Sequence, residues 1–280
     1  MKLAPLNYIL GVSAGFHDAS ITLINSDGKI EFAGHSERYS KLKNDPDLHP
    51  ALLEEVCDYY IDTIAYYERP WLKQLRRLRS GEGIDWHNIT VNQVIHNQLG
   101  TWYRHPARRV VNYNHHLSHA AAGFQTSPFD RATVIVIDAI GEFDTISIYG
   151  AEYVNGQAKY KKLWGQKYPH SIGLFYSAMT EQVGLKPMEE EYILMGMSAY
   201  GSSVSSVAMS QSLVENVDRV EFKENLHIGS SYNFKEHYDN EDIAAGAQHL
   251  CEQLIYTVIE RARDFGFSTN LVYQGGVALH

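Results

Sequence analysis

The chain has 280 residues, long enough for one large domain or two smaller ones, and its 44% hydrophobic and 20% charged content is typical of globular proteins rather than disordered ones. The formal net charge of -9 argues against a broad basic face, so we expect no nucleic-acid partner. No apolar stretch approaches the roughly 20 residues of a transmembrane helix and no secretion signal is evident, which predicts a cytoplasmic protein outside the membrane. Cys57 and Cys251 are far apart and lack CxxC spacing, which indicates neither a disulfide framework nor a cysteine metal site.

The first part of the chain predicts three short strands followed by a helix. Strand patterns cover 8–13, 19–25 and 29–35, and Asp27-Gly28 is typical of the tight turn between the last two. Apolar residues then recur at helical spacing over 50–67, which predicts a helix packed on one face of the sheet.

Two further elements precede the middle of the chain. The basic segment Trp71–Ser80 has a leucine at every third position between cations, which is typical of an amphipathic helix with a solvated face. Arg109–Tyr113 predicts a short buried strand that leads into a helix beginning near His116.

The second part repeats some of these features, and we interpret the two parts as a diverged repeat. A β-branched run from Ala132 to a glycine predicts a strand, with 145–149 as its partner. Helices are expected over 172–183 and 242–265, surface excursions over 202–240, and a final short strand over 270–274.

The sharpest local pattern is NHHLSHAAAGF. His115 and His119 are four residues apart and share one face if the segment is helical, so their imidazoles can bind one divalent metal with a carboxylate from elsewhere. Asp138 ends an apolar strand, where a carboxylate is costly to bury without a cationic partner. The simpler alternatives are a surface or packing role for the histidines and a turn or cap role for Asp138.

A second candidate is GFHDAS, where Gly15 allows a tight turn whose tip would carry His17 and Asp18 toward phosphate or substrate. Ordinary turn chemistry explains the same residues. The mixed-charge segment GHSERYSKLKND could hold an anion through residues such as Lys43, although a solvated loop is simpler.

Two glycine-containing segments, YILMGMSAYG and QGGVAL, lie beside apolar elements where backbone can approach a nucleotide closely. Neither matches a Walker loop or a dinucleotide fingerprint.

Eight segments together resemble the carbamoyltransferase family of nodulation and antibiotic O-carbamoylation enzymes. In chain order they are GVSAGFHDAS, ERYSKLKND, YYERPWLKQL, NHHLSHAAAGF, VIDAIGE, PHSIGLFYSAMTEQVG, EYILMGMSAYG and NLVYQGGVAL. The resemblance implies an α/β, actin-like (ribonuclease-H-like) fold with a first subdomain over 1–125 and an incomplete second one over 126–280. It also implies a YrdC-like C-terminal domain, which this sequence lacks, so the missing domain or its split counterpart is an expected partner.

The resemblance further implies chemistry in two stages. Carbamoyl phosphate and ATP give carbamoyl-adenylate in the YrdC-like domain, and the N-terminal domain passes the carbamoyl group to a hydroxyl of a small-molecule acceptor. His115, His119 and Asp138 match the metal positions, for Fe2+, Zn2+, Mn2+ or Mg2+. His17 and Asp18 fall at the catalytic contacts, with His17 the better base. The expected nucleotide contacts are Lys43, Met195, Gly196, Gly275 and Gly276.

Some residues depart from the family pattern. The remaining metal aspartate belongs to a segment after GGVAL, Asn114 stands where an acidic residue is frequent, and His280 replaces a usual Asn. The alternatives are an ATP-dependent kinase or phosphohydrolase on the same scaffold, and a metal- or nucleotide-binding module without turnover. A homodimer is compatible with every one of these readings.

Overall fold

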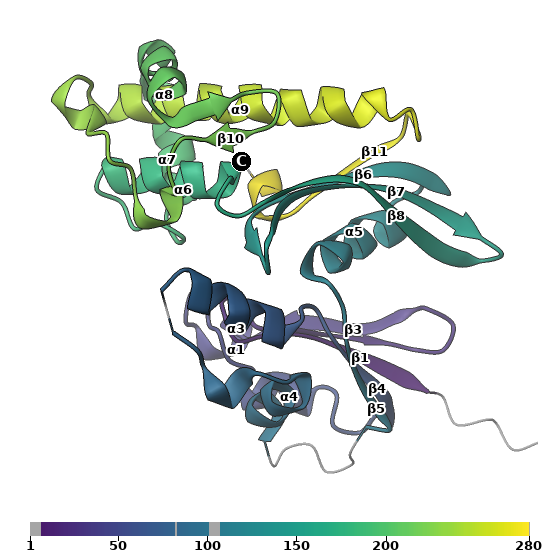
Figure 1. Cartoon of the computed structure of the whole chain (residues 1–280). Coiled ribbons are helices and arrows are strands. Elements are labelled where there is room, and N and C mark those ends of the chain that lie inside the picture. Colours follow the sequence, from purple (N-terminus) through teal and green to yellow (C-terminus); the bar gives the residue numbers. More distant parts are fainter. Residues whose placement is uncertain (1–6, 82, 101–106, 280) are drawn as a thin grey trace, which may run out of the picture. The chain divides into compact units, whose positions relative to one another are not determined.

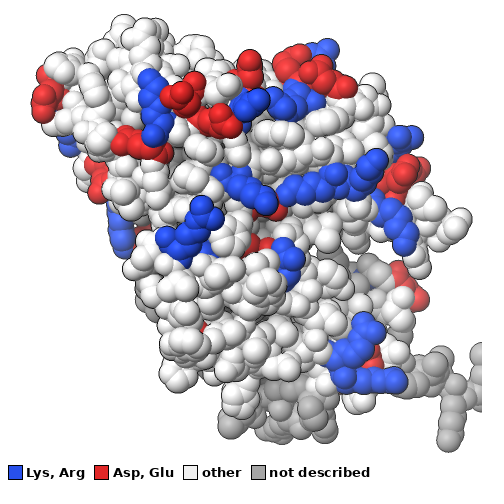
Figure 2. Space-filling model, viewed as in Figure 1, with Lys and Arg blue, Asp and Glu red and all other residues white. Residues whose placement is uncertain are grey.

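The computed structural model describes residues 7–81, 83–100 and 107–279. The chain divides into two compact units, unit 1 (Met1–Ser118) and unit 2 (His119–His280). Within the described residues, no helix is long and apolar enough to cross a membrane. Lys and Arg side chains are interspersed with Asp and Glu on the face shown in Figure 2.

Unit 1 is built on a five-stranded sheet with the order β3-β2-β1-β4-β5 (Figure 1). The strands β1, β2 and β3 form an antiparallel meander, while β4 runs parallel to β1, and β5 runs parallel to β4. The bounds are β1 Tyr8–Ser13, β2 Ser20–Ile24, β3 Ile30–His35, β4 Ile61–Tyr66 and β5 Arg109–Asn112. The predicted meander and the strand over 109–113 are therefore confirmed, but the expectation that the latter is buried is wrong, because no residue of β5 is buried.

The helices of unit 1 cover its sheet and begin at recognisable caps. Thr90 and Gln93 form a capping box at the start of α4, which satisfies two otherwise unpaired backbone donors. Prolines occupy the first turn of α2 and α3, where their missing N–H has no helical partner to lose. The bounds are α1 Glu37–Ser40, α2 Pro50–Glu54, α3 Pro70–Arg79, α4 Val91–Leu99 and the 3-10 helix η1 Trp86–Asn88.

The predicted helix over 50–67 is wrong after its first turn and a half. Helix α2 ends at Glu54, and the apolar residues that follow form the central strand β4, whose Ile61, Ile64 and Tyr66 are buried. Tyr60, which the helical pattern placed in the core, is 59% exposed. Pairing with two parallel neighbours overrides the local periodicity here, because a strand covered on both faces has no clean alternation.

Unit 2 contains a four-stranded sheet with the order β11-β6-β7-β8, in which β6, β7 and β8 are antiparallel and β11 runs parallel to β6. Helices α6 and α9 cover one face and α5 lies against the other (Figure 1). The strand bounds are β6 Arg131–Gly141, β7 Asp144–Val154, β8 Gln157–Lys167, β9 Val214–Asn216, β10 Glu221–Phe222 and β11 Leu271–Gln274. The helix bounds are α5 His115–Thr126, α6 Ile172–Gln182, α7 Glu191–Met197, α8 Ser206–Leu213 and α9 Asn240–Asp264, and the boundary between the units falls inside α5, after Ser118. The 3-10 helices are η3 Ser198–Tyr200, η4 Ser203–Ser205, η5 Leu226–Ile228, η6 Phe234–Glu236 and η7 Gly276–Leu279.

The segment 202–240 is more than a surface excursion, and that prediction is wrong in part. Its Met209, Leu213, Phe222 and Phe234 are buried in the same hydrophobic core as α6 and α9. The polar residues between these four buried side chains give the segment the composition of a loop, while the buried side chains pack it against the core of unit 2.

The two units share one connection pattern. In each, a three-stranded antiparallel meander is followed by helices and then by a strand parallel to the first strand of the meander. This is the repeated unit of the ribonuclease-H-like fold, so the predicted α/β, actin-like class is confirmed.

Candidate metal centre

Helix α5 carries the histidine pair. The side-chain oxygen of Asn114 accepts a hydrogen bond of 3.0 Å from the Leu117 N–H, so Asn114 caps the helix, a role for which asparagine is among the best residues. The helix begins at His115 and continues unbroken past His119, which places these two imidazoles one turn apart on one face. Its predicted start near His116 is one residue late.

Asp138 comes from the far end of β6. Residues 132–137 of this strand are buried, and its regular pairing with β7 is interrupted between Ile137 and Gly141. Asp138 lies within this irregular stretch, where its side chain is 17% exposed and its Oδ1 accepts a bond of 2.9 Å from the Ala139 N–H. The Asp138 carboxylate therefore lies at the edge of the core rather than inside it.

These elements bring three potential ligands together. The ligand atoms of His115, His119 and Asp138 all lie within 4.8 Å of one another. His119 Nε2 is 3.7 Å from Asp138 Oδ2, less than twice the about 2.1 Å of a metal–nitrogen or metal–oxygen bond. Two imidazoles and one carboxylate, each partly buried, are a donor set that suits Zn2+, Fe2+ or Mn2+. The residues therefore fit a divalent first-row ion.

The glycine pair after β11 packs against the same strand end. Gly275 has φ +99°, and a Cβ at this position would collide with the Ile137 carbonyl group. A Cβ on Gly276 would lie 3.1 Å from Asp138 Oδ1. Position 275 therefore requires glycine, because of its positive φ and its close approach to Ile137. Gly276 borders the Asp138 carboxylate.

The other predicted nucleotide contacts lie elsewhere in their units. Met195 and Gly196 are on α7, where Met195 packs on the core of unit 2 and a Cβ on Gly196 would meet open space. Lys43 lies in the exposed segment after α1 in unit 1.

His17 and Asp18 occupy the exposed tip between β1 and β2. His17 Nδ1 and Asp18 Oδ2 are 2.8 Å apart, and Asp18 has φ +52°, a left-handed conformation that aspartate tolerates better than most residues. Backbone bonds from the Gly15 and Ala19 N–H groups to the segment 45–46 fix both ends of the turn. The pair is thus an imidazole oriented by a carboxylate.

Sequence reasoning missed two residues beside His115. Glu68 follows β4 and is 4% exposed, with Oε1 2.8 Å from Lys73 Nζ and Oε2 3.7 Å from His115 Nδ1. Burial by itself raises the pKa of the Glu68 carboxyl, but His115 and the Lys73 ammonium outweigh it and hold the pKa at about 2. The sequence signal that could have identified Glu68 is its position, because it is a carboxylate between a strand and the proline at which helix α3 begins.

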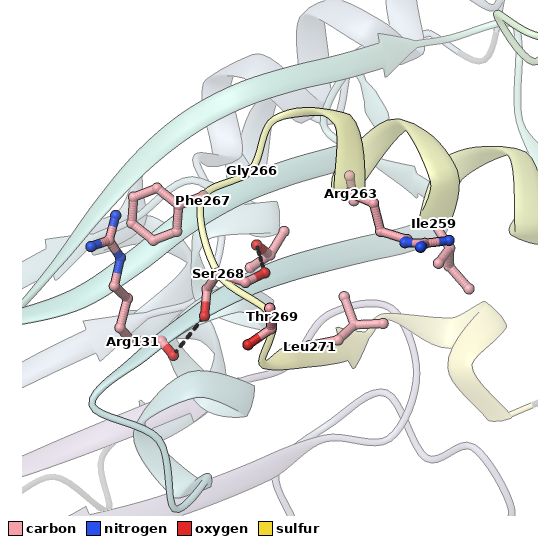
Figure 3. Close-up of a pocket in the computed structure, with 10 residues that line it drawn as sticks. Arg131, Ile259, Arg263, Gly266, Phe267, Ser268, Thr269 and Leu271 are labelled. Atoms are coloured by element: carbon pink, nitrogen blue, oxygen red, sulfur yellow. Dashed lines mark hydrogen bonds between the residues drawn. The ribbon is translucent and has the colours of Figure 1, made fainter.

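A cavity of about 640 Å³ lies at the opposite end of β6 from Asp138. Figure 3 shows it between the last turns of α9, the loop 266–269 and the first residues of β6 and β11. Arg131 stacks on Phe267 there and Arg263 pairs with Glu260, so both guanidinium groups already have partners. This cavity is separate from the histidine cluster.

Comparison with known sequences gives a family. Residues 59–280 match the model described as "Carbamoyltransferase N-terminus". An uncharacterized protein of Synechocystis is 31% identical over 221 residues, 70% of this chain and 35% of that protein. An uncharacterized protein of Methanocaldococcus jannaschii is 29% identical over 69% of this chain and 33% of its own length. Nodulation protein NolNO of Sinorhizobium fredii is 24% identical over 94% of this chain and 41% of its own length. The chain thus spans between 33% and 41% of these curated relatives.

Solved structures resemble the chain more distantly. A putative N-acetylmannosamine kinase from Listeria monocytogenes is 11% identical with a TM-score of 0.42, covering 98% of this chain and 84% of that one. YeaZ from Pseudomonas aeruginosa is 12% identical with a TM-score of 0.32, covering 59% and 68%.

Proposed function

Because the chain belongs to the family of carbamoyltransferase N-terminal domains, we propose that it carries the carbamoyl-transfer site of an O-carbamoyltransferase. The family match over residues 59–280 carries this proposal, and the cluster of His115, His119 and Asp138 within that range supports it. The donor is carbamoyl-adenylate, made from carbamoyl phosphate and ATP by a YrdC-like domain. The acceptor is a hydroxyl group of a small molecule.

We assign the metal to the cluster of His115, His119 and Asp138, whose two imidazole nitrogens favour Fe2+ or Zn2+ over Mg2+. When bound, a divalent ion supplies positive charge that orients the adenylate and stabilises the negative charge developing at the attacked acyl centre.

His17 is the proposed general base. A proton on Nδ1 donated to Asp18 leaves the lone pair on Nε2, the atom that accepts the proton of the acceptor hydroxyl. The acceptor oxygen then bonds to the carbamoyl carbon, the bond from that carbon to the phosphate oxygen of the adenylate breaks, and AMP leaves. Asp18 stabilises the imidazolium that forms.

The nucleotide half of the donor is assigned to backbone. The exposed Gly276 presents main chain beside Asp138 that a phosphate or ribose can contact, and Gly275 packs this turn against Ile137. Met195, Gly196 and Lys43 remain proposed contacts for the same nucleotide.

The test is a transfer assay in trans. The 280-residue chain is mixed with the separately produced YrdC-like part of a relative, carbamoyl phosphate labelled with 14C, ATP and a panel of hydroxyl acceptors. Label in an acceptor, formed with AMP and absent for a His115→Ala, His119→Ala variant, supports the proposal. Transfer of the terminal phosphate of ATP instead supports the kinase alternative. Metal and nucleotide binding without label in any acceptor supports a binding module, and the transferase proposal then fails for this chain.

A further inference from the structure

We propose that Glu68 is a positioning residue for His115 and that Lys73 holds Glu68 in place. This inference rests on the proposed metal function. It concerns the segment YYERPWLKQL, to which neither the metal cluster nor the proposed chemistry assigns a role.

The topology of unit 1 places these residues together. Strands β4 and β5 are parallel neighbours that end in register, with Tyr66 opposite Asn112. Glu68 follows the end of β4 and His115 follows the end of β5, so both leave the same edge of the sheet. The carboxyl ends of adjacent parallel strands are where side chains from separate segments converge.

Further contacts lock the start of α5 onto the segment after β4. The Ser118 hydroxyl donates a hydrogen bond of 2.7 Å to the Tyr67 carbonyl, and the Tyr67 and His115 rings meet edge to face at 5.3 Å. The His115 imidazole therefore lies in a fixed place beside Glu68 whether or not the two interact strongly.

Glu68 is buried among cationic and donor groups, which are Lys73, His115 and the Tyr66 hydroxyl at 3.5 Å from Oε1. Its side chain is 5% exposed, Oε1 accepts a hydrogen bond of 2.8 Å from Lys73 Nζ, and Oε2 faces His115 Nδ1 at 3.7 Å. A buried carboxylate is costly unless charges and donors surround it. Lys73 provides that compensation from the first turns of α3, and its ammonium also lies 5.3 Å from the centre of the Phe16 ring.

The consequence concerns which nitrogen of His115 can bind a metal. A histidine ligand commonly donates its second ring N–H to a carboxylate, which fixes the tautomer and the ring orientation and raises the basicity of the coordinating nitrogen. The Glu68 carboxylate faces Nδ1 and favours a proton there, which leaves the lone pair on Nε2. At 3.7 Å the contact is electrostatic rather than a short hydrogen bond, so its role is to select the tautomer and orient the ring.

The chain of contacts also joins three of the motifs. Phe16 belongs to GFHDAS, Lys73 and Glu68 to YYERPWLKQL, and His115 to NHHLSHAAAGF. The Lys73–Glu68 pair is thus the link in unit 1 between the loop that carries the proposed base and the helix that carries the metal ligands.

The experiment compares Co2+ binding by the whole chain and its Glu68→Gln and Lys73→Met variants, using a competing chelator and the visible spectrum of bound Co2+. Glu31→Gln is the matched control, because Glu31 is another lysine-paired carboxylate of unit 1 on the β2–β3 hairpin. We expect Glu68→Gln to weaken affinity by about 10- to 100-fold at an unchanged stoichiometry, as is typical when the outer partner of a ligand is lost. Lys73→Met should weaken it less, and Glu31→Gln should bind as the parent does.

A second readout needs no metal and no substitution of Glu68. Nitrogen-15 NMR of the metal-free parent should show His115, assigned from the spectrum of His115→Ala, as the Nδ1–H tautomer. Parental affinity in a folded Glu68→Gln chain, or the Nε2–H tautomer in the parent, would overturn the inference while leaving the proposed function intact. Absence of Co2+ binding by the parent would instead reject the metal assignment on which both rest.

Discussion

The Asp138 carboxylate lies 3.7 Å from the Nε2 of His119, so strand β6 and helix α5 bring a carboxylate and an imidazole within reach of one metal ion. Neither residue is deeply buried, since 17% of the Asp138 side chain and 33% of the His119 side chain remain exposed. A site of this kind can exchange its ion with solvent, which makes its affinity directly measurable.

Asp138→Asn should remove the charged ligand and leave the strand in place. An amide is a weaker ligand than a carboxylate, and even the loss of an outer partner costs about 10- to 100-fold in affinity, so we expect a loss beyond that range. Competition for Zn2+ against a chromophoric chelator measures it. Asp130→Asn, at an exposed position just before β6, is the matched control. Equal Zn2+ affinity for Asp138→Asn and the parent would exclude Asp138 as a ligand.

Gly276→Ala should weaken metal binding without unfolding the chain. The new methyl group would lie 3.1 Å from Asp138 Oδ1, so the carboxylate must move by a few tenths of an ångström. Gly196→Ala is the control, because its methyl group enters open space on helix α7, where alanine is the better helix former. The same Zn2+ competition distinguishes them. A Gly276→Ala chain with parental affinity would show that the glycine turn is independent of the site.

Gly275→Ala should destabilise unit 2 itself. Both the φ of +99° and the collision with the Ile137 carbonyl oppose a side chain, and we expect a loss of at least about 1–3 kcal/mol in the free energy of unfolding. Gly156→Ala separates the two causes, since Gly156 has φ +74° but nothing within 4 Å of its added Cβ. Urea denaturation followed by circular dichroism gives both values. Equal losses for the two variants would mean that the collision contributes nothing.

The two cysteines should differ in reactivity and in their effect on stability at high pH. Burial, with a smaller effect from Glu252, raises the pKa of the Cys251 thiol to about 12, while Cys57 is exposed. Near neutral pH a thiol reagent should label Cys57 quickly and Cys251 only on unfolding. Above pH 9 the unfolded chain loses the Cys251 proton first, so this residue's contribution to stability declines between pH 9 and about 12. A Cys251→Ala chain should show a smaller alkaline decline, and an equal one would contradict the assignment.

The fold was predictable where local patterns and tertiary pairing agree. The meander over 8–35 has tight turn signals and alternation, and the helix over 242–265 has a clear apolar face. The helix over 172–183 was predictable from its apolar periodicity, and its residues 172–180 are buried on all sides. Strand β4 was not predictable from the sequence, because its neighbours in the sheet, β1 and β5, come from distant parts of the chain. Strand β8 was not predicted, because none of its residues is buried and it lacks the β-branched run that marks β6.

The candidate site was predictable to a similar degree. The spacing of His115 and His119 needs only a helix, and Asp138 stood out as a charge ending an apolar run. Glu68 and Lys73 were not predicted as site residues, since the leucine spacing of the segment that contains Lys73 predicts a helix with a solvated face. Helix α3 is indeed present, but one of its cations turns inward to a buried carboxylate. The proximity of Glu68 to His115 becomes visible only in the structure, where they follow the ends of the adjacent strands β4 and β5.

The metal dependence of carbamoyl transfer decides whether the cluster of His115, His119 and Asp138 takes part in the reaction. The initial rate of 14C transfer is measured for the metal-free chain, before and after one equivalent of Fe2+ or Zn2+, beside an Asp138→Asn chain in the same assay. We expect a rate close to background without metal, recovery on addition of metal, and no recovery for Asp138→Asn. An unchanged rate in the metal-free chain, or full transfer by Asp138→Asn, would contradict it.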